Sequence, residues 1–126
     1  MVSIRKKKGV YEIVSECLFC MIANGEIPSK KVYEDEEVLA IYDIEPAAPV
    51  HVLVMPKTHI TGMNEVKDEQ LALIGRLHGI MRDLAIKLGI SEGYRIVNNY
   101  GEKGGQSVPH LHFHLLGGRN LLWPPG

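Results

Sequence analysis

Residues 110–116 have the sequence His-Leu-His-Phe-His-Leu-Leu. Successive side chains of a β-strand point to opposite faces, so this alternation predicts a strand with three imidazoles on one face and Leu111, Phe113 and Leu115 on the other. With six histidines in 126 residues, His at both further positions of the template arises by chance roughly once in 440 trials. The chain must therefore cover the apolar face with another layer, and we expect the histidine face to be open.

One stretch of the chain has the length and spacing to provide that layer. Between Glu65 and Gly89, apolar residues recur every three or four positions, which predicts one long amphipathic helix. The order of strands, helix and strands predicts an α+β fold. The other expected elements are a short helix at 17–24 and strands at 31–34, 38–42, 50–55, 94–98 and 111–116, the first two strands forming a hairpin around an acidic turn.

Size and charge restrict the possible partners. The 126 residues suit one domain, predicted over 17–126, with residues 1–16 as a Lys-rich N-terminal extension that forms either a solvated arm or an extended start. Fourteen Lys and Arg against fifteen Asp and Glu leave a net charge of −1, without the basic field of a nucleic-acid-binding protein. We expect no nucleic-acid partner and no membrane partner, since no apolar run approaches the ~20 residues of a membrane span. The absence of a signal-peptide pattern predicts a cytoplasmic location.

A Gly-rich loop precedes the histidine segment. Three imidazoles on one face can ligate a metal or bind an anion, and neutral imidazole can also act as a nucleophile. The loop from Gly101 to Ser107 contains three glycines whose backbone N–H groups could approach an anion, together with side-chain donors from Asn99, Gln106 and Ser107. Because the loop ends at His110, it predicts phosphate donors beside the imidazole face.

The segment 110–116 matches at all seven positions the pattern of the histidine triad (HIT) family, and its flanks resemble the HINT branch of nucleoside phosphoramidases. The resembling stretches are 17–25, 32–44, 49–60, 93–99 and 104–126, the last ending in Trp-Pro-Pro-Gly. The resemblance implies a five-stranded antiparallel sheet that dimerises through the strand 94–98 and the long helix into a ten-stranded sheet. It also implies a hydrolase that cleaves the P–N bond of AMP or GMP amidates, with a purine nucleotide as substrate.

The same resemblance implies a role for each matching residue. His112 would attack the α-phosphorus and form a nucleotidyl-histidine, while His110 and His51 would orient it. The phosphate oxygens would be held by His114, Asn99, Gln106, Ser107 and the backbone of Gly105. Asp43 would bind the ribose hydroxyls, Leu18, Phe19, Ile22, Ile44 and Leu53 would line the purine pocket, and Trp123 would reach toward the partner's active site.

Cys17 and Cys20 form a second constellation. Without a secretion signal a structural disulfide is disfavoured, which leaves metal binding, redox chemistry or packing. Resemblance to zinc-carrying members implies a Cys2His2 site completed by His59 and His110, structural in role, so that catalysis requires no cofactor. Other members keep only the second cysteine and bind no metal, in which case Cys20 is a buried side chain.

Two further functions are compatible with these residues. The triad face itself could ligate zinc or copper in a metal-binding module, which leaves the donors of the Gly-rich loop unexplained. A nucleotide-binding regulatory protein with little turnover would differ from the hydrolase only in rate. Some single residues also have structural alternatives: Asp43 could be a turn aspartate, and Phe19 and Ile22 could be core residues. His78 lies off the apolar stripe of the long helix and is assigned no role.

Overall fold

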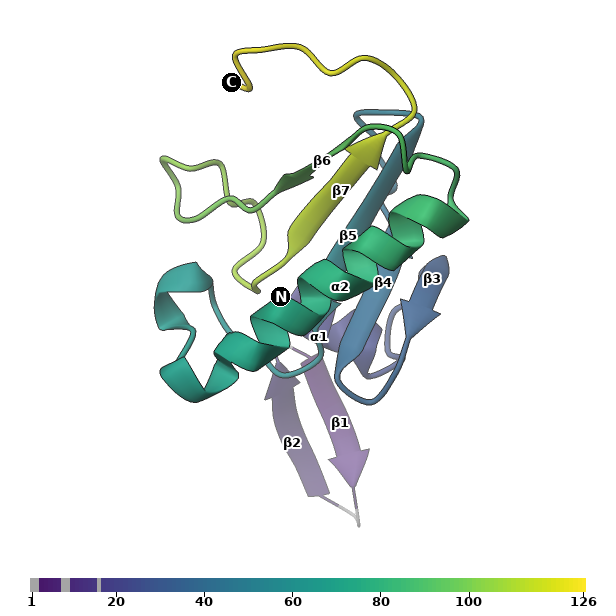
Figure 1. Cartoon of the computed structure of the whole chain (residues 1–126). Helices are drawn as coiled ribbons and strands as arrows, with labels where there is room; N and C mark the ends of the chain where they lie inside the picture. Colours follow the sequence, from purple (N-terminus) through teal and green to yellow (C-terminus); the bar gives the residue numbers. More distant parts are fainter. Residues whose placement is uncertain (1–2, 8–9, 16) are drawn as a thin grey trace.

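The computed structural model describes residues 3–7, 10–15 and 17–126 (Figure 1). Its centre is a five-stranded antiparallel sheet in the order β3-β4-β5-β7-β6. The strands are β3 (Lys31–Glu34), β4 (Val38–Tyr42), β5 (Val50–Pro56), β6 (Tyr94–Val97) and β7 (Phe113–Gly117). With one long helix and one short helix, the predicted α+β architecture is confirmed, and β6 lies at an edge of the sheet.

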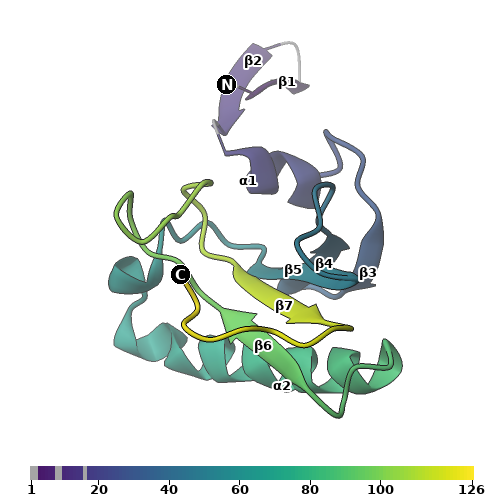
Figure 2. The same ribbon diagram turned by 90° about the horizontal axis from the view of Figure 1, so that it is seen from above.

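The long helix α2 (Leu71–Lys87) covers one face of the sheet, as Figure 2 shows. Two short 3-10 turns, η1 (Met63–Glu65) and η2 (Asp68–Gln70), precede it, so the regular helix begins later than the sequence pattern suggested. Its buried side chains Leu77 and Met81 share one core cluster with Leu111, Phe113 and Leu115. The apolar side of the histidine segment therefore meets the long helix, and each fully buried side chain of this kind contributes about 1.5–3 kcal/mol.

The short helix α1 (Leu18–Ala23) lies on the opposite face of the sheet (Figure 2). Phe19 and Ile22 form a second core cluster with Leu39 of β4 and Leu53 of β5. Consecutive side chains of β4 and β5 thus alternate between the two clusters, which explains why both strands are buried along most of their length.

The expectation of an open histidine face is wrong. His110 is 0% exposed and His112 is 4% exposed. The cause is α1, whose Phe19 ring lies edge-on to both imidazoles, with centroid distances of 6.0 Å to His110 and 4.9 Å to His112. The regular strand is also shorter than predicted, because β7 begins at Phe113 and the segment 110–112 precedes it.

The N-terminal extension contains a hairpin that the sequence analysis did not predict. Strands β1 (Ser3–Lys7) and β2 (Val10–Ser15) form a separate two-stranded antiparallel sheet, whereas the sequence indicated only a solvated arm or an extended start. Val10, Tyr11, Ile13 and Val14 are strand-favouring residue types, which gives the segment a reason to pair. The remaining positions of the extension lie outside the described residues.

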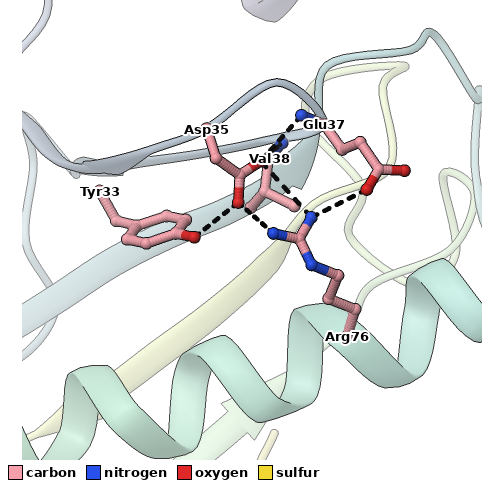
Figure 3. Close-up of polar contacts among 5 residues, drawn as sticks. All are labelled: Tyr33, Asp35, Glu37, Val38 and Arg76. Atoms are coloured by element: carbon pink, nitrogen blue, oxygen red, sulfur yellow. Dashed lines mark hydrogen bonds and ion pairs between the residues drawn. The ribbon is translucent and has the colours of Figure 1, made fainter.

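A polar cluster ties the turn between β3 and β4 to α2 (Figure 3). Asp35 Oδ1 accepts the backbone N–H groups of Glu37 and Val38 at 2.8 and 2.9 Å, and Oδ2 accepts the Tyr33 hydroxyl. Arg76 of α2 donates to both Asp35 and Glu37. Burial alone raises the pKa of Asp35, but the hydrogen bonds from Arg76, Tyr33 and the two amides outweigh it and hold that pKa well below its usual range.

Candidate active site and metal centre

Four histidines gather between β5, β7 and α1. His51 lies on β5 and His114 on β7, and their rings meet with His51 Nε2 2.9 Å from His114 Nδ1. His112 lies just before β7, with its ring centroid 5.1 Å from that of His114. His110 lies two residues earlier and turns toward Cys17 and His59. Only two of the three triad imidazoles therefore belong to the cluster around His51.

The position of the proton on His112 follows from its backbone contact. His112 Nδ1 lies 2.7 Å from the carbonyl oxygen of His110. A carbonyl can only accept, so Nδ1 carries the proton and Nε2 carries a lone pair. Burial lowers the pKa of His112, so the ring is neutral near pH 7. The carbonyl oxygen of His112 itself accepts from Asn98 Nδ2 at 2.9 Å, which holds the residue from a second side.

The backbone amide of Ala47 determines which ring nitrogen carries the proton in His51 and His114. The N–H of Ala47 donates to His51 Nδ1 at 3.0 Å, so His51 carries its proton on Nε2 and donates it toward His114 Nδ1. His114 must then carry its own proton on Nε2. Burial lowers the pKa of His51, and burial with the neighbouring His112 and His51 rings lowers that of His114 to about 4. The site thus pairs an imidazole with a nitrogen lone pair, His112, with an imidazole N–H donor, His114.

Asp43 faces this cluster while also shaping a turn. Its Oδ2 lies 3.5 Å from His51 Nε2, and its Oδ1 accepts the backbone N–H of Glu45 at 2.8 Å. The turn role that we weighed as an alternative is therefore present, and one carboxylate oxygen remains directed at the histidines. Among the residues expected to line the purine pocket, Ile44 is 96% exposed and Leu18 is 39% exposed. Phe19, Ile22 and Leu53 belong to the core cluster under α1.

The Gly-rich loop is held by the groups that we expected to hold phosphate. Gln106 Oε1 accepts from Gly101 N at 2.9 Å, and Gln106 Nε2 donates to the carbonyls of Thr61 and Val108 at 2.7 and 3.1 Å. The Gly105 N–H donates to the Glu102 carbonyl at 3.0 Å. A phosphate contact from either group would have to replace one of these bonds, which leaves the side chains of Asn99 and Ser107 as the simpler donors.

Trp123 lies in the C-terminal segment and is 80% exposed. The guanidinium of Arg95 on β6 lies over its ring at 5.9 Å and donates to the carbonyl of Leu122 at 2.9 Å. The segment is thus fastened to the edge strand, with a large aromatic side chain in solvent.

Cys17, Cys20, His59 and His110 converge as a possible metal centre. His110 Nδ1 lies 3.3 Å from Cys17 Sγ, 3.4 Å from Cys20 Sγ and 3.2 Å from His59 Nδ1. Cys20 Sγ lies 3.2 Å from His59 Nδ1. Ligands of a tetrahedral zinc ion at ordinary bond lengths lie about 3.3–3.8 Å apart, so the four groups fit zinc closely.

The proton on His110 also suits metal binding. His110 Nε2 donates to the carbonyl of Pro56 at 2.8 Å, so Nδ1 presents its lone pair to the cysteines and His59. Burial lowers the pKa of His110 to about 4, which keeps the ring neutral. Asp43, His51 and His114 also lie close enough together for a metal. There, however, the amide of Ala47 places the proton on the His51 nitrogen that would have to coordinate. The cysteine centre is the one with the correct tautomer.

Sequence reasoning missed Asn98 and the backbone groups of Ala47 and Pro56. Asn98 is adjacent to Asn99, the residue expected to contact phosphate, and the strand pattern gave no reason to prefer a contact with the His112 carbonyl. The Ala47 amide and the Pro56 carbonyl act through backbone atoms, which residue identity does not reveal.

Comparison with known proteins matches the HIT domain family over residues 24–121. The chain is 46% identical over 114 residues to a Zea mays protein named 14 kDa zinc-binding protein, covering 89% of each chain. It is 45% identical over 114 residues to adenylylsulfatase HINT1 of Arabidopsis thaliana, covering 89% of this chain and 78% of that protein. The solved structure of a HIT family hydrolase from Legionella pneumophila Philadelphia 1 has a TM-score of 0.87 and 50% identity, covering 88% of this chain and 100% of that one.

Proposed function

The chain belongs to the HIT domain family, and on that premise we propose that it is a purine nucleoside phosphoramidase. It would cleave the P–N bond of AMP or GMP amidates through a nucleotidyl-histidine at His112. The observation that carries the proposal is the assignment of the His112 proton to Nδ1, because the remaining lone pair on Nε2 is the nucleophile that this chemistry needs.

In the first step, His112 Nε2 forms a bond to the α-phosphorus and the P–N bond of the substrate breaks. The electron pair of that bond leaves with the amine nitrogen, which takes up the Nε2 proton of His114. The His114 ring becomes anionic for the lifetime of the intermediate, and the His51 Nε2–H that faces its Nδ1 stabilises this charge. Positive charge develops on the His112 ring, where the Nδ1–H bond to the His110 carbonyl stabilises it. The same charge favours proton loss from His114, since the two ring centroids are 5.1 Å apart.

In the second step, water attacks the phosphorus and gives one proton to His114 Nε2. The bond between phosphorus and His112 breaks, its electron pair returns to Nε2, and a nucleoside monophosphate is released. Both rings then have their starting protons. His51 supports His114 throughout, because its Nε2–H keeps His114 Nδ1 as an acceptor.

The substrate would lie across the residues that the family resemblance assigns to it. Asp43 would bind the ribose hydroxyls, and the exposed apolar side chains Leu18 and Ile44 would contact the purine. Asn99 and Ser107 would hold the phosphate oxygens, and the Gly105 N–H and the Gln106 side chain would join them by exchanging bonds that they make within the loop. A homodimer formed through the β6 edge would bring Trp123 of the partner subunit toward the leaving group.

Zinc is proposed as a structural ion at Cys17, Cys20, His59 and His110. The donor set and ligand spacing support it, as does the name of the maize relative. A closed four-ligand site keeps no open position for substrate, so zinc would supply conformational stability.

No described helix has the length and apolar character to cross a bilayer. The cytoplasmic location expected from the sequence is kept as part of the proposal.

A second candidate reaction differs only in the leaving group. The Arabidopsis relative is named an adenylylsulfatase, an enzyme whose substrate joins AMP to sulfate. The same attack by His112 would serve such a substrate, with sulfate leaving in place of an amine. We favour the P–N bond because His114 presents a proton donor, which an amine requires and a sulfate does not.

The decisive experiment mixes the full chain with adenosine 5′-phosphoramidate and measures its intact mass after rapid quenching. We expect a transient increase equal to one nucleotidyl group in the wild-type chain and in a His78→Asn control, and none in His112→Asn. His78 provides the control because its contacts are with the Ile74 carbonyl and the Phe113 ring, on the opposite face of the sheet. An adduct that persists in His112→Asn would contradict the assignment.

A further inference from the structure

The proposed metal centre and the proposed nucleophile share one residue. His110 offers its ring nitrogen Nδ1 to the cysteines and His59, and offers its backbone carbonyl to Nδ1–H of His112 at 2.7 Å. The hydrogen bond that assigns the His112 tautomer is therefore made by the backbone of a metal-binding residue. A shift of His110 that breaks this bond would remove the contact that fixes the His112 tautomer.

The segment that carries His110 and His112 is buried and is held by individual hydrogen bonds, among them His110 N–H to the Val108 carbonyl at 2.8 Å and Asn98 Nδ2 to the His112 carbonyl at 2.9 Å. It precedes β7 and lies outside the regular ladder. The N–H of Leu111 donates to the carbonyl of Ile60 at 2.6 Å, directly beside His59 in sequence. The ring of His110 is fixed at its other nitrogen by the Pro56 carbonyl. A metal that binds both His59 and His110 would therefore add a further fixed contact to the hydrogen bonds that position this segment.

The cysteines connect the same centre to the cover of the active site. Cys17 is the N-cap of α1, and its Sγ accepts the backbone N–H of Cys20 at 3.3 Å. Phe19 lies between the two cysteines in sequence and packs edge-on against His112 at 4.9 Å. A metal bound by both thiolates would fix the position of α1, and with it the edge-on contact of Phe19 with the His112 ring.

From this geometry we propose that the metal bound by Cys17, Cys20, His59 and His110 positions the catalytic ring of His112. It acts through the His110 carbonyl and through Phe19, which is a positioning residue. The metal takes no part in bond making. This inference rests on the proposed function only in naming His112 as the reacting ring, and it assigns the metal a second role beyond stability.

The test uses the full chain with 15N-labelled histidine at one fixed pH and needs no substrate. In the zinc-loaded wild type we expect long-range 1H–15N spectra in which His112 is a single tautomer protonated at Nδ1. After zinc is removed by a chelator, or in His59→Asn, we expect the two His112 nitrogen shifts to move toward each other as both tautomers become populated. His51 is an internal reference, because the Ala47 amide sets its tautomer independently.

His59→Asn is the preferred variant because His59 is exposed and its side chain contacts Cys20 and His110, both members of the metal centre. His78→Asn is the matched control, with the zinc content and His112 signals of the wild type. For the phosphoramidase reaction, we expect kcat to fall roughly 10–100-fold without metal. KM should change by less than about 3-fold, and zinc should restore the stripped wild type but not His59→Asn.

A second variant keeps the test decisive if the metal-free chain fails to fold. Phe19→Leu retains all four ligands, and we expect one zinc per chain together with partial loss of the single His112 tautomer. Unchanged His112 spectra after zinc loss from a folded chain, or in zinc-loaded Phe19→Leu, would overturn the proposal. A wild-type chain that binds no zinc would overturn it as well. Absence of turnover with an intact spectral response would instead refute the proposed function alone.

Discussion

Two polar clusters on this sheet, one partly exposed and one buried, treat charge in opposite ways. Around Asp35, opposite charges are paired, and the hydrogen bonds from Arg76 and Tyr33 keep the carboxylate ionised (Figure 3). Around His112, burial removes charge, and backbone carbonyls and amides decide where each proton lies. The first arrangement fastens the β3–β4 turn to α2. The second leaves one nitrogen lone pair in a neutral setting, as a nucleophile requires.

The largest effect expected from this comparison is on rate. His112→Asn keeps an N–H donor for the His110 carbonyl but removes the nucleophilic nitrogen. We expect phosphoramidate hydrolysis to fall at least roughly 1,000-fold, while AMP affinity changes by less than about 3-fold. Steady-state kinetics and calorimetric AMP titration would measure the two quantities. A loss of binding that matches the loss of rate would mean that His112 acts in recognition.

The next effect separates the two steps assigned to His114. In His114→Ala, transfer from adenosine 5′-phosphoramidate to His112 should slow by about 100–10,000-fold, because the amine leaves without its proton donor. Transfer from adenylyl sulfate should slow far less, since sulfate leaves without a proton. The adduct from adenylyl sulfate should then accumulate, because water lacks its proton acceptor. Rapid quenching with intact-mass detection would follow both substrates, and equal slowing would contradict the donor role.

The Asp35 cluster should give the reverse result, with stability lost and rate retained. Asp35→Asn weakens the hydrogen bonds to Tyr33, Arg76 and two backbone amides. We expect a loss of about 1–2 kcal/mol in the free energy of unfolding, since solvent screens the ion pair with Arg76, whose side chain is 39% exposed. Glu36→Gln, an exposed change in the same turn, is the control and should alter stability by less than about 0.5 kcal/mol.

The pH dependence of that loss follows from the lowered pKa of Asp35. A carboxyl with a depressed pKa in the folded state stabilises the fold above its unfolded pKa, which is about 3.9 for Asp. The contribution declines as the pH falls below that value toward the folded pKa. The stability advantage of the wild type over Asp35→Asn should therefore be constant near neutrality and shrink in acid. An advantage that stays constant into strong acid would show that the charge of Asp35 is irrelevant.

The sequence predicted the elements that have a strong periodic signal and missed those set by tertiary contact. The alternation at 110–116 and the spacing of α2 were sufficient for the helix and its apolar contact with the histidine segment. The other strands followed from their own β-rich runs, and the five-stranded antiparallel sheet followed from the family resemblance. The closed histidine face depends on where α1 packs, and no local pattern specifies that placement. The tautomers depend on backbone atoms of Ala47, Pro56 and His110, which are invisible in residue identity. Residue identity also did not indicate that Gln106 makes hydrogen bonds within the Gly-rich loop, which needs such bonds to hold its own shape.

The smallest expected effects come from the neighbouring side-chain amides of Asn98 and Asn99. They test most finely which residues support the His112 segment and which bind substrate. Asn98 donates to the His112 carbonyl at 2.9 Å, whereas Asn99 is assigned to the phosphate by family resemblance alone. Asn98→Ala should lower the free energy of unfolding by about 0.5–1.5 kcal/mol and leave AMP affinity nearly unchanged. Asn99→Ala should weaken AMP binding by about 3–10-fold, the value of one hydrogen bond, with little change in stability. Thermal unfolding and AMP titration of both variants would decide between them. If Asn98→Ala weakened binding and Asn99→Ala weakened the fold, the boundary between supporting and binding groups would lie one residue away from where we place it.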